Sequence, residues 1–103
     1  MVEWSVTTTG LPDAASIALP LVAQGDYALV EQITLQIGEE TLVDTCVEIY
    51  GGPDDIHREY LPPGPARTHE IYIHGGVKIA PGVAATVTLS NVVAAISVSG
   101  SLT

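Results

Sequence analysis

The stretch VAATVTLSNVVAAISV, residues 83–98, decides the fold class of this 103-residue chain. Apolar side chains alternate with small or polar ones on both sides of Ser90 and Asn91, the period of two that is typical of half-buried strands. A two-residue turn at Ser90 and Asn91 would oppose the alternating apolar residues of the two strands. The pairs are Leu89 with Val92, Val87 with Ala94, Ala85 with Ile96 and Val83 with Val98. Asn91 tolerates the left-handed backbone that such a turn needs. The stretch therefore predicts a β-hairpin.

The same pairing argument predicts two further hairpins. In residues 71–79, a three-residue loop over 74–76 would place Ile73 opposite Val77. In residues 27–50, a loop over 38–40 would place Leu35 opposite Val43 and leave two glutamates at a solvated tip.

Apolar residues also alternate in two N-terminal segments, residues 2–6 and 17–21. The first predicts a strand with Trp4 pointing inward. In the second, Pro20 lacks an N–H group and confines the segment to a sheet edge or a bulge.

Residues 51–67 are rich in Gly, Pro and charge and predict a long loop. A loop of this length in a small domain is usually functional or disordered. Ile56 and Leu61 are placed to pin it to the core. The Pro62-to-Pro65 spacing matches a minimal proline recognition motif, although a stiff crossover loop explains it better.

Composition agrees with an all-β fold. Val, Ile and Thr together account for 31 residues, and branching at Cβ favours a pleated surface over a helix. The chain predicts a single domain over residues 1–103, an antiparallel β-sandwich or small jelly roll of seven or eight strands built from hairpins.

The charge balance excludes several partners. The net charge is −9, and Arg58, Arg67 and Lys78 are the basic residues. Nucleic acids and anionic membranes both require clustered Lys and Arg, so neither is expected as a partner. The acidity favours solubility, with a basic partner surface as the functional alternative. We expect no signal peptide and no membrane span.

No pattern indicates catalysis, a metal site or a cofactor. Cys46 lies in an alternating strand, and no local motif joins it to His57, His69 or His74. No second cysteine exists to build a zinc site. Calcium at Asp54 and Asp55 is the one metal hypothesis worth testing. The chain is expected not to be an enzyme.

Three stretches give the chain a resemblance to the small β-rich accessory proteins of tailed bacteriophages. These are Thr7-Thr8-Thr9-Gly10, the run over residues 77–83, and the small-residue ending over 94–101. The resemblance implies a virion structural protein that decorates a capsid, is made in the host cytoplasm, and binds other virion subunits as a homo-oligomer.

Two regions are candidates for partner contacts. Exposed strand edges can add a neighbour's strand. The candidate contact residues are Trp4, Leu11, Ile17 and Leu19 in the N-terminal segment, and Asp54, Asp55, Arg58, Tyr60 and Arg67 in the long loop. The N-terminal segment could equally close its own sheet. The alternative function is a soluble binding module for a carbohydrate or protein ligand, which gains if Tyr50 and Tyr60 stand exposed on one face.

Overall fold

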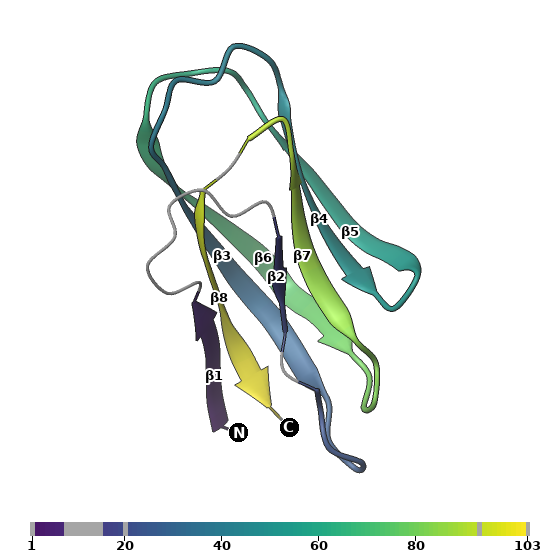
Figure 1. Cartoon of the computed structure of the whole chain (residues 1–103). Coiled ribbons are helices and arrows are strands. Elements are labelled where there is room, and N and C mark those ends of the chain that lie inside the picture. Colours follow the sequence, from purple (N-terminus) through teal and green to yellow (C-terminus); the bar gives the residue numbers. More distant parts are fainter. Residues whose placement is uncertain (1, 8–15, 20, 93, 103) are drawn as a thin grey trace.

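The computed structural model describes residues 2–7, 16–19, 21–92 and 94–102, with the backbone alone described for residues 2–7. Within these ranges the chain forms eight strands and no helix. The strands are β1 (Val2–Thr7), β2 (Ser16–Ala18), β3 (Ala28–Ile37), β4 (Thr45–Gly51), β5 (Asp54–Leu61), β6 (Arg67–Ile79), β7 (Ala85–Ser90) and β8 (Ala95–Leu102). They form two four-stranded sheets (Figure 1).

The sheets are antiparallel, with strand orders β1-β8-β3-β6 and β2-β7-β4-β5. Thus β1 pairs with β8, β2 with β7, β3 with β6, and β4 with β5. The chain is one long hairpin whose tip, at residues 51–54, coincides with the middle of the sequence. Its arms fold over to build both sheets. This is a jelly-roll arrangement, and it confirms the prediction of an antiparallel all-β fold.

The core lies between the sheets and consists of the side chains that alternate inward along the strands. The largest fully buried side chains are Ile33, Leu35, Ile49, Ile79, Ile96, Val30, Val47, Val87, Val98 and Thr45. Full burial of one Val, Leu or Ile side chain contributes about 1.5–3 kcal/mol. Hydrophobic burial is therefore the main stabilising term, and Cys46 is a free thiol.

The predicted hairpin over residues 71–79 is wrong, because β6 runs unbroken from Arg67 to Ile79. Gly75 and Gly76 adopt positive φ angles of 82° and 74°. They lie where the register between β3 and β6 shifts, so residues 73–76 bulge opposite the interval between Val30 and Gln32. Glycine accepts such angles without strain, and here it produces a bulge in a strand instead of a reversal.

The other two predicted hairpins are also wrong. β3 and β4, on either side of residues 38–40, lie in opposite sheets, and so do β7 and β8 on either side of Ser90 and Asn91. The left-handed backbone of Asn91 is as expected, with φ of 66°. Alternation marks the face that a strand turns toward the core. Two such faces meet across a sandwich as well as within a hairpin, so the pattern does not identify the pairing partner.

The predicted long loop over residues 51–67 is wrong for most of its length. β5 pairs with β4 across a tight turn, which leaves only residues 62–66 as the connection to β6. β5 is an edge strand with charged or polar side chains on both faces, a common protection of an exposed edge that hides the alternation. Leu61 is buried as predicted, whereas Ile56 is 41% exposed.

Both N-terminal segments form strands, as predicted, and both lie at sheet edges. Trp4 pairs in register with Gly100, and its predicted inward side chain lies outside what the structure describes, as does Pro20. Leu21 lies beyond β2 and is 69% exposed.

Candidate functional site

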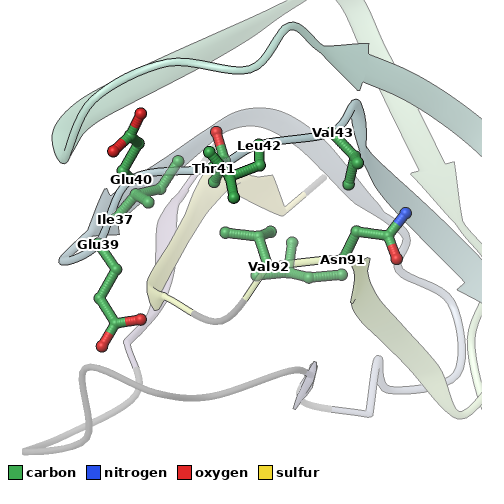
Figure 2. A pocket seen from close by; sticks show the side chains of 9 residues that line it. Ile37, Glu39, Glu40, Thr41, Leu42, Val43, Asn91 and Val92 are labelled. Carbon is green, nitrogen blue, oxygen red and sulfur yellow. The ribbon is translucent and has the colours of Figure 1, made fainter.

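A cavity of about 610 Å³ opens at the end of the sandwich where the chain crosses between the sheets (Figure 2). One crossing is the segment 38–44 between β3 and β4, and the other is the segment between β7 and β8. The cavity, here called the crossover pocket, is lined by Ile37, Glu39, Glu40, Thr41, Leu42, Val43, Leu89, Asn91 and Val92.

The crossover pocket has an apolar floor and a mixed rim. Ile37 and Leu89 are 3% and 5% exposed and belong to the core. Leu42 and Val43 are 80% and 54% exposed, although they are apolar. The glutamates at positions 39 and 40 are both exposed and lie on the opposite side of the opening from Val43 and Asn91 (Figure 2). The pocket therefore joins accessible apolar surface to negative charge.

Hydrogen bonds hold the wall of the crossover pocket in place. The Thr41 N–H donates to the Gly64 carbonyl at 2.8 Å, and the Gly64 N–H donates back to the Thr41 carbonyl at 3.1 Å. On the other side, the Asn91 side-chain amide donates to the Asp44 carbonyl at 3.3 Å. The left-handed backbone of Asn91 places its amide near this segment. The pocket is thus built by residues distant in sequence.

A group of polar and charged side chains lies on the outer face of the sheet that contains β4 and β5. The Arg58 Nη2 atom is 2.7 Å from the Asp55 Oδ2 atom and 3.3 Å from the Glu48 Oε2 atom. The Tyr50 hydroxyl donates to the same Glu48 oxygen at 2.6 Å. The Arg58 Nη1 atom donates to the Tyr60 hydroxyl at 3.4 Å. We call these five residues the polar cluster.

Contacts within the polar cluster shift the pKa values of Glu48 and Tyr50, and of the neighbouring Cys46. The hydrogen bond from Tyr50, together with the charge of Arg58, lowers the pKa of Glu48 to about 2. The same bond raises the pKa of Tyr50. Burial, and then the nearby Glu48, raises the pKa of the Cys46 thiol. A thiol with a raised pKa is poorly ionised at neutral pH and is therefore a weak nucleophile.

The structure brings three of the predicted site residues together, Asp55, Arg58 and Tyr60. Asp54 opens β5 and is exposed. Arg67 lies apart from the cluster, because its guanidinium donates to the carbonyls of Pro62 and Pro65 at 3.0 and 2.8 Å.

Two of the N-terminal candidates for partner contacts, Ile17 and Leu19, are buried and cannot contact a partner. Ile17 and Leu19 are 9% and 6% exposed and pack in the core of their own chain. β2 closes its own sheet by pairing with β7. Leu11 lies outside the described residues, and so does the side chain of Trp4. Within the described part of the chain, these segments therefore serve the fold.

Sequence reasoning missed Glu48 of the polar cluster and the crossover pocket as a whole, and it considered Tyr50 only as an aromatic ring beside Tyr60. A signal for Glu48 in the polar cluster was present in the spacing of Cys46, Glu48 and Tyr50, because residues two apart on a strand share a face. The crossover pocket had no local signal, since its lining comes from two separate crossings.

Among the described residues, no group of three or more His, Cys, Asp and Glu side chains is arranged to hold a metal ion. Asp55, a candidate for calcium, instead accepts a hydrogen bond from Arg58. The His57 Nε2 atom lies 3.3 Å from a Glu59 carboxylate oxygen. No described helix is long and apolar enough to cross a membrane.

Comparison with known proteins gives likenesses of fold. No protein-family model matches the chain, and no curated protein matches its sequence. The Drosophila NLP core, whose structure concerns pentamer formation and histone binding, has a TM-score of 0.59 and 20% identity, and the match covers 98% of this chain and 97% of that one. The coat protein of tobacco streak virus has a TM-score of 0.40 and 14% identity, with 96% and 85% covered. The first likeness bears on the fold alone, and the second is too loose to argue from.

Proposed function

We propose that this protein is a non-enzymatic structural protein that assembles into a closed ring of identical subunits and serves as an accessory component of a virion. The observation that carries the ring is the distribution of charge. The chain has a net charge of −9, yet residues 79–103 contain no charged residue. Strands β7 and β8 lie within this range.

Like-charged subunits repel unless they meet on neutral surfaces. Along β8, Ile96 and Val98 point into the core, so Ser97 and Ser99 point outward. Along β7, Val87 is buried and the half-exposed Thr86 and Thr88 are on the outer face. Both strands therefore offer small, uncharged side chains to a neighbour.

These two neutral surfaces lie on opposite faces of the molecule, because β7 and β8 belong to different sheets (Figure 1). Two different surfaces on one subunit suit a head-to-tail contact, in which one subunit's β8 face meets the next subunit's β7 face. Such contacts close into rings when the rotation permits. The pentamer formed by the NLP core supports this arrangement.

Support for the virion setting comes from two sides. Jelly rolls are a recurrent architecture of viral capsid domains, and the sequence resembles phage accessory proteins. A fold alone does not assign a function, so the setting depends on its own test. Two observations support the non-enzymatic role. The raised pKa makes the Cys46 thiol a weak nucleophile. In the polar cluster, Glu48 and Arg58 are engaged in an ion pair with each other.

The alternative is a soluble binding module for a carbohydrate or protein ligand, and its carbohydrate form has less support. Tyr50 and Tyr60 are on the same outer face, but Tyr50 is only half-exposed and its hydroxyl is bonded to Glu48. Tyr60 is 66% exposed, while the other strongly exposed aromatic ring among the described side chains, Tyr72, is in the opposite sheet. A stacking platform needs neighbouring exposed rings.

The ring is tested by native mass spectrometry and light scattering of the purified protein. We expect one closed oligomer for the wild type and loss of that species in Ser99→Asp and in Thr86→Glu, which each charge one neutral face. An equimolar mixture of the two variants should form a dimer through the two intact faces. Thr68→Glu, on the exposed face of β6, is the matched control and should keep the ring.

A monomeric wild type, or variants that leave the oligomer unchanged, would contradict the ring. The virion setting is tested by mass spectrometry of gradient-purified particles from the natural source. The chain should occur there at a fixed ratio to the major coat protein, and its absence from the particles would refute that setting.

A further inference from the structure

We propose that the crossover pocket is the docking site for an extended basic segment of a partner protein, which inserts one apolar side chain into it. The inference rests on the protein-binding role proposed above, but it does not depend on the ring.

The apolar part of the pocket explains the inserted side chain. Leu42 is the most exposed large hydrophobic residue among the described ones, and Val43 is next to it. Their surface continues to the buried floor formed by Ile37 and Leu89. Exposed apolar surface that borders a cavity is characteristic of interaction sites. The volume of about 610 Å³ lies in the range of pockets that enclose small ligands.

The charge of the rim selects a basic occupant. Glu39 and Glu40 line the pocket, and Asp44 follows its wall. In the described part of the chain, no ion pair neutralises any of the three, and no cationic side chain lines the pocket. A second copy of this chain would bring its own charge of −9 toward these carboxylates. A segment with Lys or Arg on both sides of an apolar residue matches both features of the pocket.

The backbone of the rim favours an extended segment. Thr41 is already paired with Gly64, and Asp44 accepts from Asn91. Between them, Leu42 and Val43 lie outside any strand, and no hydrogen bond within the described residues involves their N–H or carbonyl groups. These groups can pair with the backbone of an extended peptide, the mode in which main-chain bonds give affinity and a pocket gives specificity.

The test uses two fluorescein-labelled peptides, Gly-Lys-Arg-Leu-Arg-Lys-Gly and the same peptide with serine in place of leucine. Binding to the purified full chain, in the oligomeric state that it adopts, is measured by fluorescence anisotropy at low and physiological salt. We expect the leucine peptide to bind roughly tenfold or more tightly, because burial of a leucine side chain contributes at least that factor. Equal affinity for the two peptides would overturn the proposal.

Variants locate the site. The double variant Leu42→Ser with Val43→Ser should abolish the preference for leucine, and both positions are exposed enough to leave folding intact. The double variant Glu39→Gln with Glu40→Gln should weaken the binding of both peptides and make that binding less dependent on salt concentration. The control pair, Glu31→Gln with Glu70→Gln, makes the same charge change at exposed positions on β3 and β6. An equal effect of the control pair would refute the site.

The two proposals fail separately. An intact ring that does not bind the leucine peptide would remove the docking site and leave the ring. A monomer that binds it through Leu42 and Val43 would remove the ring and leave the docking site.

Discussion

Thr41 and Gly64 are 23 residues apart, and they join the two connections that flank the central β4–β5 hairpin. Besides the reciprocal backbone bonds, the Gly64 N–H donates to the Thr41 hydroxyl at 3.0 Å. Thr41 is buried, with 7% of the residue exposed. The two residues thus form an isolated β-bridge. It lies between the last pair of the β3–β6 ladder and the first pair of the β4–β5 ladder, and it fixes one wall of the crossover pocket.

Replacing Thr41 by valine removes the hydroxyl and keeps the shape and the backbone bonds. The hydroxyl accepts from the Gly64 N–H and also donates to the Gly64 carbonyl at 3.3 Å. We expect a loss of about 1–2 kcal/mol in the free energy of unfolding, because each hydrogen bond contributes roughly 0.5–1.5 kcal/mol net. Urea denaturation measures it. An unchanged midpoint would show that the backbone bonds alone hold the bridge.

Gly100 of β8 lies against the backbone of β3, where an added Cβ atom would overlap the Leu29 carbonyl oxygen. The obstacle is backbone and cannot rotate away. We expect Gly100→Ala to lower the free energy of unfolding by at least about 2 kcal/mol, in the range of overpacked sites. Gly38→Ala is the control, since nothing lies within 4 Å of the added atom, and it should stay within about 0.5 kcal/mol of wild type.

The hydroxyl of Thr45 is fully buried and has no hydrogen-bond partner among the described residues. A buried polar group without a partner costs about 1–3 kcal/mol. Thr45→Val keeps the shape of the side chain and removes this group, so we expect it to raise the free energy of unfolding by about 1 kcal/mol. The same change at the exposed Thr68 is the control. A destabilised Thr45→Val protein would show that the hydroxyl has a partner in solution.

The low pKa of Glu48 gives stability a defined dependence on pH. The native carboxyl titrates at about 2 against an ordinary value of 4.5. A lowered native pKa adds stability above pH 4.5, and this contribution is lost as the pH falls from there through about 2. Glu48→Gln should therefore flatten the change in unfolding midpoint between pH 5 and 2. A variant with the same slope as wild type would assign that dependence to other carboxylates.

The fold class was predictable because Cβ-branched residues and alternation depend on local geometry. The topology was not. The alternation predicts that Leu35 and Val43 pair in a hairpin. In the structure, Leu35 is buried in one sheet and Val43 is an exposed residue of the crossing to the other. In a jelly roll nearly every partner is remote, and single-sequence alternation carries no information on remote partners.

The candidate sites were predictable to the extent that their residues are neighbours in sequence. Asp55, Arg58 and Tyr60 were found because they follow one another along one segment. Glu48 was not, since its outward position on β4 resembles an ordinary solvated one until Arg58 is placed across from it. The crossover pocket depends on where two chain crossings meet, which only the tertiary structure determines.

The doubled-over path of the chain also constrains the order in which it can fold. The turn at residues 51–54 closes a short loop, while the pairing of Val2 with Leu102 alone would close almost the whole chain. Loop-closure entropy rises with loop length, and non-local pairing slows folding. Once β4 and β5 are joined, however, each outer pair needs only a short further closure. Folding should therefore zip outward from the centre of the sequence, and the two terminal strands should be the last to join and the first to fray.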